Sequence, residues 1–417
     1  MDDTPVVVIV GPRQCGKSTL AELIAGERGA QQVTLDDAAR RAAANADPSG
    51  FVAELELPAV IDEFQKAPEL LPAIKGRVDR ARAGGRRAAG MFLLTGSANV
   101  WGTLRVSESL AGRAERVQLW PFSQGEVRGR REAFLDELLA GRVPRVAGAP
   151  SGRRAVAAAV VTGGYPEMLA RTDARRRARW IANYVEMVLE RDARDLAAKA
   201  QQLGELPRLL AAAAARVGGL LEIAELARDA KLGRDTTGRY LTLLELLFLL
   251  RRAPAWSRNV GQRLIKAPKV WLPDSGLAAH LVGCDERRFA ADDTPLAGAL
   301  FENFIASEVA KQATWCEADV ALHHFRTAGG REVDIVVEAR DGAVAGIEAK
   351  LGATVRERDF SGLRRLRDSL GERFRAGVVV HTGVETLPFG DRLWAMPVAG
   401  VWGLGHASIA CNSEQSG

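Results

Sequence analysis

The sequence predicts an α/β fold that begins with a parallel β-sheet, and two observations support this class. Residues 6–10 (VVVIV), 58–61 (PAVI) and 91–94 (MFLL) are continuous apolar runs, which are typical of strands buried on both faces. The first run is followed by a short polar loop and then by the helical pattern TLAELIAGE. Strands that alternate with helices favour a parallel sheet whose polar loops meet at one edge.

The loop after the first strand has the spacing of a phosphate-binding loop. In GPRQCGKST, four residues separate Gly11 from Gly16, and Lys17 and Ser18 follow directly. Backbone N–H groups of such a loop surround phosphate oxygens, and the helix N-terminus favours negative charge. Lys17 is expected to reach the β- and γ-phosphates of ATP, and Ser18 to ligate Mg²⁺. The residues expected to bind the nucleotide here are Gly11, Pro12, Arg13, Gln14, Cys15, Gly16, Lys17, Ser18 and Thr19.

Polar residues at the ends of the next two strands would complete an ATPase site. Asp62 is expected to hold Mg²⁺ through water, and Glu63 to act as the general base on the attacking water. Either Thr95 or Ser97 could contact the γ-phosphate, and the sequence does not choose between them. Arg113 is a candidate catalytic arginine, a group that contributes about 10³ to 10⁵ in rate. A surface salt bridge is the alternative for Arg113, and the sequence leaves open whether it acts within one chain.

Length and composition restrict the class of protein. A chain of 417 residues is expected to form roughly two to four domains, and 47% hydrophobic residues is typical of globular proteins. A net charge of +5 permits binding to DNA without requiring it. The four cysteines form no CxxC pair, which fits reduced thiols in the cytoplasm and no structural zinc. Apolar runs are too short for a membrane span, and the acidic N-terminus is unlike a secretory signal.

The middle of the chain is predicted to be mainly helical. Residues 126–205 read as a helical lid or linker, which includes an amphipathic helix at RARWIANYVEMVLERDARDL. Residues 206–288 have the helix, turn, helix and apolar-turn order of a winged helix. Its second helix would present Arg234, Thr236, Thr237 and Arg239 to DNA, unless this unit only packs against its neighbours. Asp274 precedes a helical pattern and is expected to cap it, with a catalytic role as the alternative.

The C-terminal part combines three carboxylates and a lysine in one predicted site. Glu302 lies on a helix at 299–311, and Asp334 lies on a strand joined by a hairpin to the strand of Glu348 and Lys350. Adjacent carboxylates repel each other unless a cation lies between them, so Mg²⁺ or Mn²⁺ is expected here. Lys350 would orient the attacking water. The alternative is a surface hairpin with ordinary cross-strand ion pairs.

These motifs together resemble a known family. GPRQCGKST, VIDEFQKAP, LLTGSAN and SLAGRAERVQLWPFSQGE are similar to the ATPase half of prokaryotic AAA-type ATPases joined to a DUF4143 C-terminal region. The arrangement of Glu302, Asp334, Glu348 and Lys350 resembles the PD-(D/E)xK core of restriction endonucleases, with Val333 in place of the usual proline. The expected parts are a P-loop ATPase core at 1–125, the lid at 126–205, the winged helix at 206–288, the nuclease-like domain at 289–404 and a flexible tail at 405–417.

The expected function is Mg²⁺-dependent ATP hydrolysis whose cycle controls a DNA-directed C-terminal domain. The alternative is a nucleotide-dependent switch, or a DNA- or protein-binding module, in which the nuclease-like fold does not cut. The sequence leaves open whether DNA, a protein partner or further copies of the chain bind, and whether the C-terminal domain cleaves anything.

Overall fold

The N-terminal part of the computed structural model is a five-stranded sheet, and all of its strand pairs are parallel. The strand order is β2-β3-β4-β1-β5. The strands are β1 (Val6–Val10), β2 (Gln31–Thr34), β3 (Ala59–Asp62), β4 (Phe92–Gly96) and β5 (Ala114–Gln118). The structure describes residues 1–85, 88–96, 110–146, 152–196, 203–259, 261, 263, 266–291 and 295–403. The predicted parallel α/β sheet is therefore confirmed, whereas the predicted tail at 405–417 lies outside the described residues.

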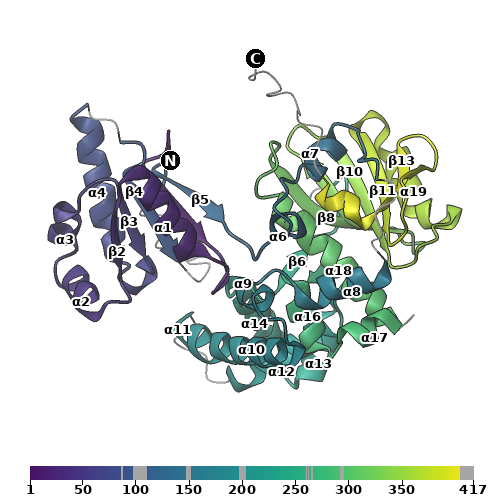
Figure 1. The fold of residues 1–417 in the computed structure, drawn as a ribbon, viewed down its shortest axis with the longest axis horizontal. Coiled ribbons are helices and arrows are strands. Elements are labelled where there is room, and N and C mark those ends of the chain that lie inside the picture. The colour runs from purple at the N-terminus through teal and green to yellow at the C-terminus, as the bar shows by residue number, and fades with distance from the viewer. Residues whose placement is uncertain are drawn as a thin grey trace, which may run out of the picture.

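Helices cover both faces of this sheet, which is why its central strands β1, β3 and β4 are mainly apolar. On one face the alternate side chains of β1 pack against α1 (Lys17–Arg28), in a cluster that includes Val7, Ile9, Ala21 and Ala25. On the other face the strands pack with α4 (Leu70–Ala83) through residues such as Ile74 and Val78. The helices α2 (Ala38–Ala46) and α3 (Pro48–Glu54) lie beside β2 and β3 at the edge of the sheet (Figure 1).

The middle of the chain is helical, as the sequence predicts. Its helices are α6 (Gln124–Val127), α7 (Phe134–Leu139), α8 (Arg153–Thr162), α9 (Pro166–Leu169), α10 (Ala174–Met187), α11 (Ala193–Leu196), α12 (Leu206–Ala214), α13 (Ile223–Ala230) and α14 (Arg234–Leu246). A turn of π-helix at Val188–Asp192 links α10 to α11. The helix α10 is amphipathic as predicted, and on its apolar face Trp180 and Tyr184 stack on each other and contact Tyr165.

A short hairpin follows α14. Its strands β6 (Arg251–Ala253) and β7 (Lys269–Trp271) are antiparallel, and Leu220 forms an isolated bridge to Lys269. The chain between the two strands pairs with the C-terminal sheet. The backbone N–H of Trp256 donates to the carbonyl oxygen of His324, and the backbone N–H of His324 donates to the carbonyl oxygen of Pro254 at 3.0 Å. This hairpin therefore fastens the middle helices to the C-terminal sheet.

The C-terminal part is a six-stranded mixed sheet of order β12-β13-β11-β10-β9-β8. The helices before and within it are α16 (Ser275–Leu281), α17 (Glu286–Ala291), α18 (Pro295–Gln312) and α19 (Ser361–Leu370). The strands are β8 (Val320–Arg326), β9 (Glu332–Ala339), β10 (Val344–Lys350), β11 (Phe374–His381), β12 (Leu387–Pro388) and β13 (Leu393–Pro397). One apolar cluster extends from Phe134 to Trp402, so the middle helices and one face of this sheet share a core.

Strand β9 contains an irregularity that the period-of-two reading missed. Between the pairs His323–Val336 and Phe325–Val333, β8 advances by two residues while β9 advances by three. Such a bulge interrupts side-chain alternation and re-aims a side chain. Val333 therefore packs with Val336 on the α19 face, whereas a strict period of two would place it with Ile335 and Val337. Within the described residues, no helix is long and apolar enough to cross a membrane.

Candidate functional site

The loop at the carboxyl end of β1 has a backbone that only its glycines allow. Gly16 has φ 102°, a left-handed conformation that other residues rarely adopt. At Gly11 an added Cβ would lie 2.0 Å from the carbonyl oxygen of Leu119, so the loop can pass the end of β5 only with glycine there. The loop then leads into α1, whose first residue is Lys17. This placement exposes backbone N–H groups at the start of a helix, which suits an anion.

Lys17 is buried beneath this loop. Lys17 is only 6% exposed, and its Nζ donates hydrogen bonds to the carbonyl oxygens of Gly11 at 3.1 Å and Pro12 at 2.7 Å. Burial lowers the pKa of Lys17, although nearby carboxylates oppose the shift. The ammonium group is therefore held at the centre of the loop, within reach of any phosphate bound there.

The predicted metal-binding residues lie together. The Ser18 hydroxyl donates to both carboxylate oxygens of Asp62 at 3.1 Å, and the hydroxyl of the fully buried Thr95 donates to Asp62 Oδ1. A hydroxyl beside a carboxylate is an oxygen donor set that suits Mg²⁺, so the residues present fit this ion. Thr95 is thus placed to orient Asp62. Ser97, the other residue considered for the γ-phosphate, lies outside the described residues.

Glu63 follows Asp62 in a conformation that turns it away from the strand direction. Its φ is 57°, and its backbone N–H donates to Thr95 Oγ1 at 3.3 Å. The Glu63 carboxylate accepts a hydrogen bond from the side-chain amide of Gln65. Glu63 also lines the same pocket as the loop. The general-base role stays a prediction that these contacts allow.

A pocket of about 680 Å³ extends from the loop toward the middle helices. Apart from the loop and Glu63, its walls are Leu20, Leu23, Leu119, Trp120, Phe122, Glu126, Pro166, Glu167 and Met187. The wall is more apolar than polar, as is usual for sites that take a flat ring. The sequence analysis did not identify these residues, although the run LWPF directly after β5 was a usable signal.

Arg13 of the loop is paired with the lid. Its Nε donates to Asp192 Oδ2, and Asp192 is only 6% exposed. Asp192 stands on the π-turn after α10, 179 residues away in sequence. The sequence analysis assigned it no chemistry. This ion pair connects the phosphate-binding loop directly to the helical region.

Arg113, the candidate catalytic arginine, lies far from the phosphate-binding loop of its own chain and forms the salt bridge that was its alternative. Its carbonyl oxygen accepts the backbone N–H of Val6, the first residue of β1, so Arg113 lies at the amino edge of the parallel sheet. The phosphate-binding loop lies at the carboxyl edge, about 15 Å away for strands of five residues. The Arg113 guanidinium instead forms a bidentate pair with Asp79 at 2.6 and 3.0 Å.

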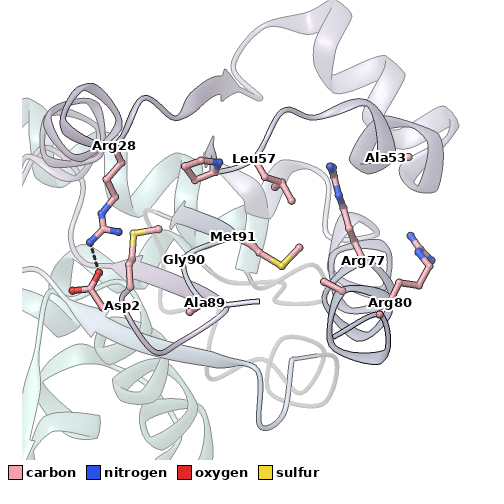
Figure 2. A pocket seen from close by; sticks show the side chains of 13 residues that line it. Asp2, Arg28, Ala53, Leu57, Arg77, Arg80, Ala89, Gly90 and Met91 are labelled. Atoms are coloured by element: carbon pink, nitrogen blue, oxygen red, sulfur yellow. Dashed lines mark hydrogen bonds and ion pairs between the residues drawn. The ribbon is translucent and has the colours of Figure 1, made fainter. Parts of the chain in front are cut away.

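A wider pocket of about 970 Å³ lies at that amino edge (Figure 2). Two of its arginines are already engaged: Arg28 pairs with Asp2 at 2.7 Å, and Arg77 donates to the carbonyl oxygens of Val52 and Leu55. It also has no loop of exposed backbone N–H groups at a helix start. The smaller pocket beside the loop is therefore the candidate nucleotide site.

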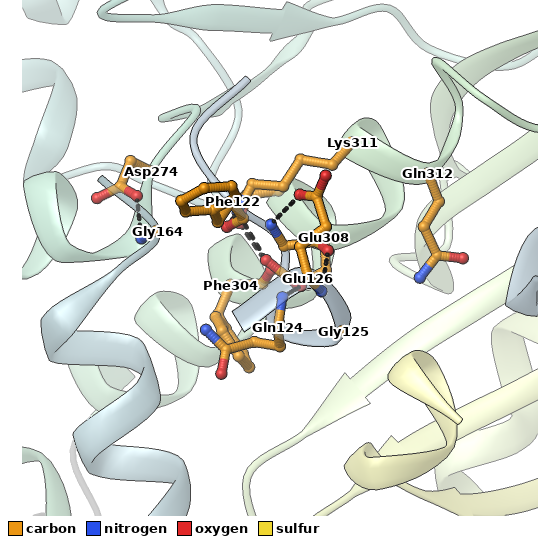
Figure 3. Close-up of polar contacts among 12 residues, drawn as sticks. Phe122, Gln124, Gly125, Glu126, Gly164, Asp274, Phe304, Glu308, Lys311 and Gln312 are labelled. Atoms are coloured by element: carbon orange, nitrogen blue, oxygen red, sulfur yellow. Dashed lines mark hydrogen bonds and ion pairs between the residues drawn. The ribbon is translucent and has the colours of Figure 1, made fainter. Parts of the chain in front are cut away.

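The polar contacts in Figure 3 connect the wall of the nucleotide pocket to α18. We call the six residues that form these contacts the α18 junction: Phe122, Gln124, Gly164, Asp274, Glu308 and Lys311. Buried Lys311 donates to the carbonyl oxygen of Phe122 at 3.0 Å and to Glu308 at 2.7 Å, while Glu308 accepts the N–H of Gln124 at 2.6 Å. Asp274 caps α16 as predicted, through Leu277 N–H, and its second oxygen accepts Gly164 N–H.

The four predicted residues of the C-terminal site also lie together. Asp334 accepts the N–H of Ala349 at 3.0 Å, Glu348 accepts the N–H of Asp334 at 3.3 Å, and Lys350 pairs with Glu348 at 2.9 Å. Glu302 is joined to them through Lys269, which the sequence analysis missed: its Nζ lies 2.8 Å from both Glu302 Oε1 and Asp334 Oδ1.

Burial and neighbouring charges shift the pKa values of the carboxylates in this cluster. Burial, with the Asp334 charge nearby, raises the pKa of Glu348 to about 8. Burial alone would raise the pKa of Asp334, but the Lys269 ammonium and the Ala349 N–H hold it below its usual value.

The described residues do not support the expected second Mg²⁺ or Mn²⁺ site. In the described part of the chain, no group of three His, Cys, Asp or Glu side chains is arranged to hold a metal ion. The physical reason at this cluster is that the Lys269 ammonium lies between two of the carboxylates.

The expected DNA-reading residues on α14 are only partly accessible. Thr237 is fully buried, and its hydroxyl donates to the carbonyl oxygen of Gly233 at 3.0 Å, so the expectation that it contacts DNA is wrong. Arg234 and Arg239 are exposed, and Arg239 donates to Thr236 Oγ1 at 3.3 Å.

Comparison with known families divides the chain into three matched parts. Residues 3–128 match an AAA domain, residues 153–288 match a domain of unknown function (DUF8612), and residues 297–401 match another (DUF4143). Two relatives are 31% identical over 399 residues, which is 94% of this chain and 80% of theirs. They are the uncharacterized proteins Rv2008c of Mycobacterium tuberculosis and Mb2031c of Mycobacterium bovis.

Among solved structures, two forms of the Thermotoga maritima RuvB Holliday junction branch migration motor share 18% identity with this chain. The similarity covers 60% of this chain and 82% of RuvB, with TM-scores of 0.24 and 0.26. Such low scores carry no conclusion about this protein.

Proposed function

This chain belongs to the family that joins an AAA domain to a DUF4143 region, and on that basis we propose that it is a Mg²⁺-dependent ATPase. The contact between Ser18 and Asp62 beside the phosphate-binding loop carries this proposal. It brings a hydroxyl and a carboxylate together at the carboxyl edge of the sheet, directly beside the buried Lys17.

Each residue of the site has a role in this proposal. Backbone N–H groups of the loop bind phosphate oxygens, and Lys17 exchanges its contacts with Gly11 and Pro12 for the β- and γ-phosphates. Ser18 and Asp62 would hold Mg²⁺, which supplies positive charge that neutralises the phosphates. Thr95 keeps Asp62 in place, and Glu63 accepts the proton of the attacking water. The apolar wall at Trp120, Phe122 and Met187 receives the base.

The remaining parts would respond to the nucleotide. Phe122 lines the pocket and is also bound by Lys311 on α18, so a shift of this wall on ATP binding would reach the C-terminal helix. The Arg13–Asp192 pair offers a second connection, to the lid. Coupling through such contacts requires two arrangements of the junction, which nucleotide binding would favour unequally.

The identity of the two later parts also remains a proposal. The order of α12, the Leu220 bridge, α13, α14 and the β6–β7 hairpin supports a winged helix. The β9–β10 hairpin, the bulge at Asp334 and the parallel β11 after α19 support a PD-(D/E)xK-like fold. Between DNA cleavage and a binding or regulatory role, the position of Lys269 favours the second.

The test compares ATP hydrolysis by the wild type, Lys17→Ala and a control, Lys75→Ala on α4. Each is assayed with Mg²⁺ and with EDTA, without DNA and with single- or double-stranded DNA, and the same samples are run for cleavage products. The proposal requires turnover in the wild type and the control that is lost in Lys17→Ala and in EDTA. Equal turnover in all three proteins would refute it, while DNA stimulation or its absence decides the DNA-directed role.

A further inference from the structure

The ammonium of Lys269 occupies the centre of the C-terminal carboxylate cluster. Its side chain is only 3% exposed, and the side chains of its partners Glu302 and Asp334 are 14% and 5% exposed. Both N–O distances are 2.8 Å. A charged amine that is buried this deeply is costly unless carboxylates surround it, and here two of them do.

Five of the six carboxylate oxygens in the cluster already accept a hydrogen bond. Asp334 Oδ1 accepts from Lys269 and Oδ2 from the Ala349 N–H. Glu348 Oε1 accepts from Lys350, and its Oε2 from the Asp334 N–H. Glu302 Oε1 accepts from Lys269. A divalent ion needs several free oxygens at short distance, and it would also be repelled by an ammonium at the same place.

Lys269 is the first residue of β7, and its backbone is held within the β6–β7 hairpin. It pairs with Ala253 in β6 and with Leu220. The next residue, Val270, exchanges backbone hydrogen bonds with Gly218 and Gly219. The backbone that carries this ammonium is therefore fixed on both sides.

The same hairpin is fixed to the C-terminal sheet around the cluster. Arg263 forms a bidentate pair with Glu338 on β9 at 2.5 and 3.1 Å. The buried Trp256 packs in the core beneath α19, and Leu272 N–H donates to Asn303 on α18 at 2.7 Å. These contacts come from three places on the hairpin and its flanks, so they fix the backbone that carries Lys269.

We propose that the Lys269 ammonium is the resident cation of the Glu302–Asp334–Glu348 cluster and that it excludes divalent metal from it. The cluster then connects the middle helices to the C-terminal sheet through buried ion pairs. A metal ion and the ammonium are alternative occupants, and metal enters only when the amine is removed. This inference does not depend on ATP hydrolysis.

The test is Mn²⁺ binding to the full chain in an Asp62→Asn background, which removes a metal ligand of the nucleotide site. Binding is measured by electron paramagnetic resonance and as the shift in melting temperature that Mn²⁺ produces. In this background Lys269→Met keeps the length of the side chain and removes its charge. The proposal predicts one new Mn²⁺ site, bound about tenfold more tightly than any Mn²⁺ in the parent, and its loss on adding Asp334→Asn.

Lys350→Met is the matched control, because it removes an amine from the same cluster but from its more exposed side. It should gain no Mn²⁺ site while Lys269 remains. If Lys269→Met does not fold, the pair Lys269→Met with Glu302→Gln removes one charge of each sign and leaves Asp334 and Glu348 to bind the ion. The proposal is overturned if the parent already binds Mn²⁺ in a manner lost with Asp334→Asn, or if folded variants without Lys269 gain no site.

Discussion

Ser18 and Asp62 are 44 residues apart in the sequence, yet the Ser18 hydroxyl lies 3.1 Å from both carboxylate oxygens of Asp62. One residue stands at the start of α1 and the other ends β3, and the two strands that precede them belong to the same parallel sheet. Because the carboxyl ends of parallel strands meet at one edge, the fold itself brings these ligands together. The ATPase proposal and the following predictions depend on this edge.

Glu63→Gln should reduce the rate of ATP hydrolysis about 10²- to 10⁴-fold, because an amide cannot accept the proton of the attacking water. The Glu63 backbone, which carries the contact with Thr95, is unchanged, so affinity for Mg²⁺–ATP should stay close to that of the wild type. Single-turnover kinetics measures the rate of hydrolysis, and titration with a fluorescent ATP analogue measures the affinity. A rate within twofold of the wild type would exclude Glu63 as the base.

Asp192→Asn should weaken ATP binding and destabilise the fold by about 1–3 kcal/mol, since it leaves the Arg13 guanidinium half-buried without its carboxylate. The affected quantities are KM for ATP and the midpoint of urea unfolding. Glu190→Gln is the control, because Glu190 is an exposed acid on the same π-turn. Identical KM values for the two variants would mean that the connection between loop and lid has no part in binding.

Arg113→Ala should leave kcat within about twofold of the wild type when the chain acts alone. Its partner Asp79 is 41% exposed, so water screens this ion pair and its loss should change stability little. The measurement is ATPase activity over a wide range of protein concentration. A large loss of activity, in a reaction whose specific rate rises with concentration, would instead show that Arg113 acts on a neighbouring copy.

Glu132→Gln should remove a pH dependence of stability. Burial raises the pKa of Glu132 to about 7, with Glu308 and Glu126 nearby, while Ser123 and Gly125 N–H oppose the shift. Its folded pKa therefore exceeds the unfolded value of 4.5. The protonated form contributes stability that is present below the unfolded pKa and lost as pH rises through about 7.

From about pH 5 to pH 8 the wild type should lose up to roughly 3 kcal/mol through this group, and Glu132→Gln should lose less. Melting temperatures at the two pH values give the difference. Parallel curves for the two proteins would contradict the assignment.

The parts that the sequence predicted correctly depend on short-range patterns. The phosphate-binding loop, the two acids at the end of β3 and the hairpin of Asp334 and Glu348 each lie in or within a few residues of an apolar strand. Sequence reasoning failed where two distant segments meet. Lys269 lies 33 residues from Glu302 and 65 from Asp334, in an apolar run that predicted only a buried strand.

Arg113 shows a different limit. Arg113 directly precedes β5, whereas the residues that bind ligands in a parallel sheet follow its strands. Where β5 begins therefore decides whether Arg113 can reach the phosphates of its own chain, and the sequence did not show where that strand begins. The face on which Val333 packs could not be predicted for a similar reason. A bulge depends on how two strands pair, and a single strand's sequence does not reveal it.

The most direct test of the ATPase account is a crystal structure of the chain with Mg²⁺ and a non-hydrolysable ATP analogue. The account predicts a triphosphate wrapped by residues 11–19, with Lys17 on its β- and γ-phosphates and Mg²⁺ beside Ser18 and Asp62. A saturated crystal with an empty loop, or with the nucleotide bound elsewhere on the chain, would contradict it.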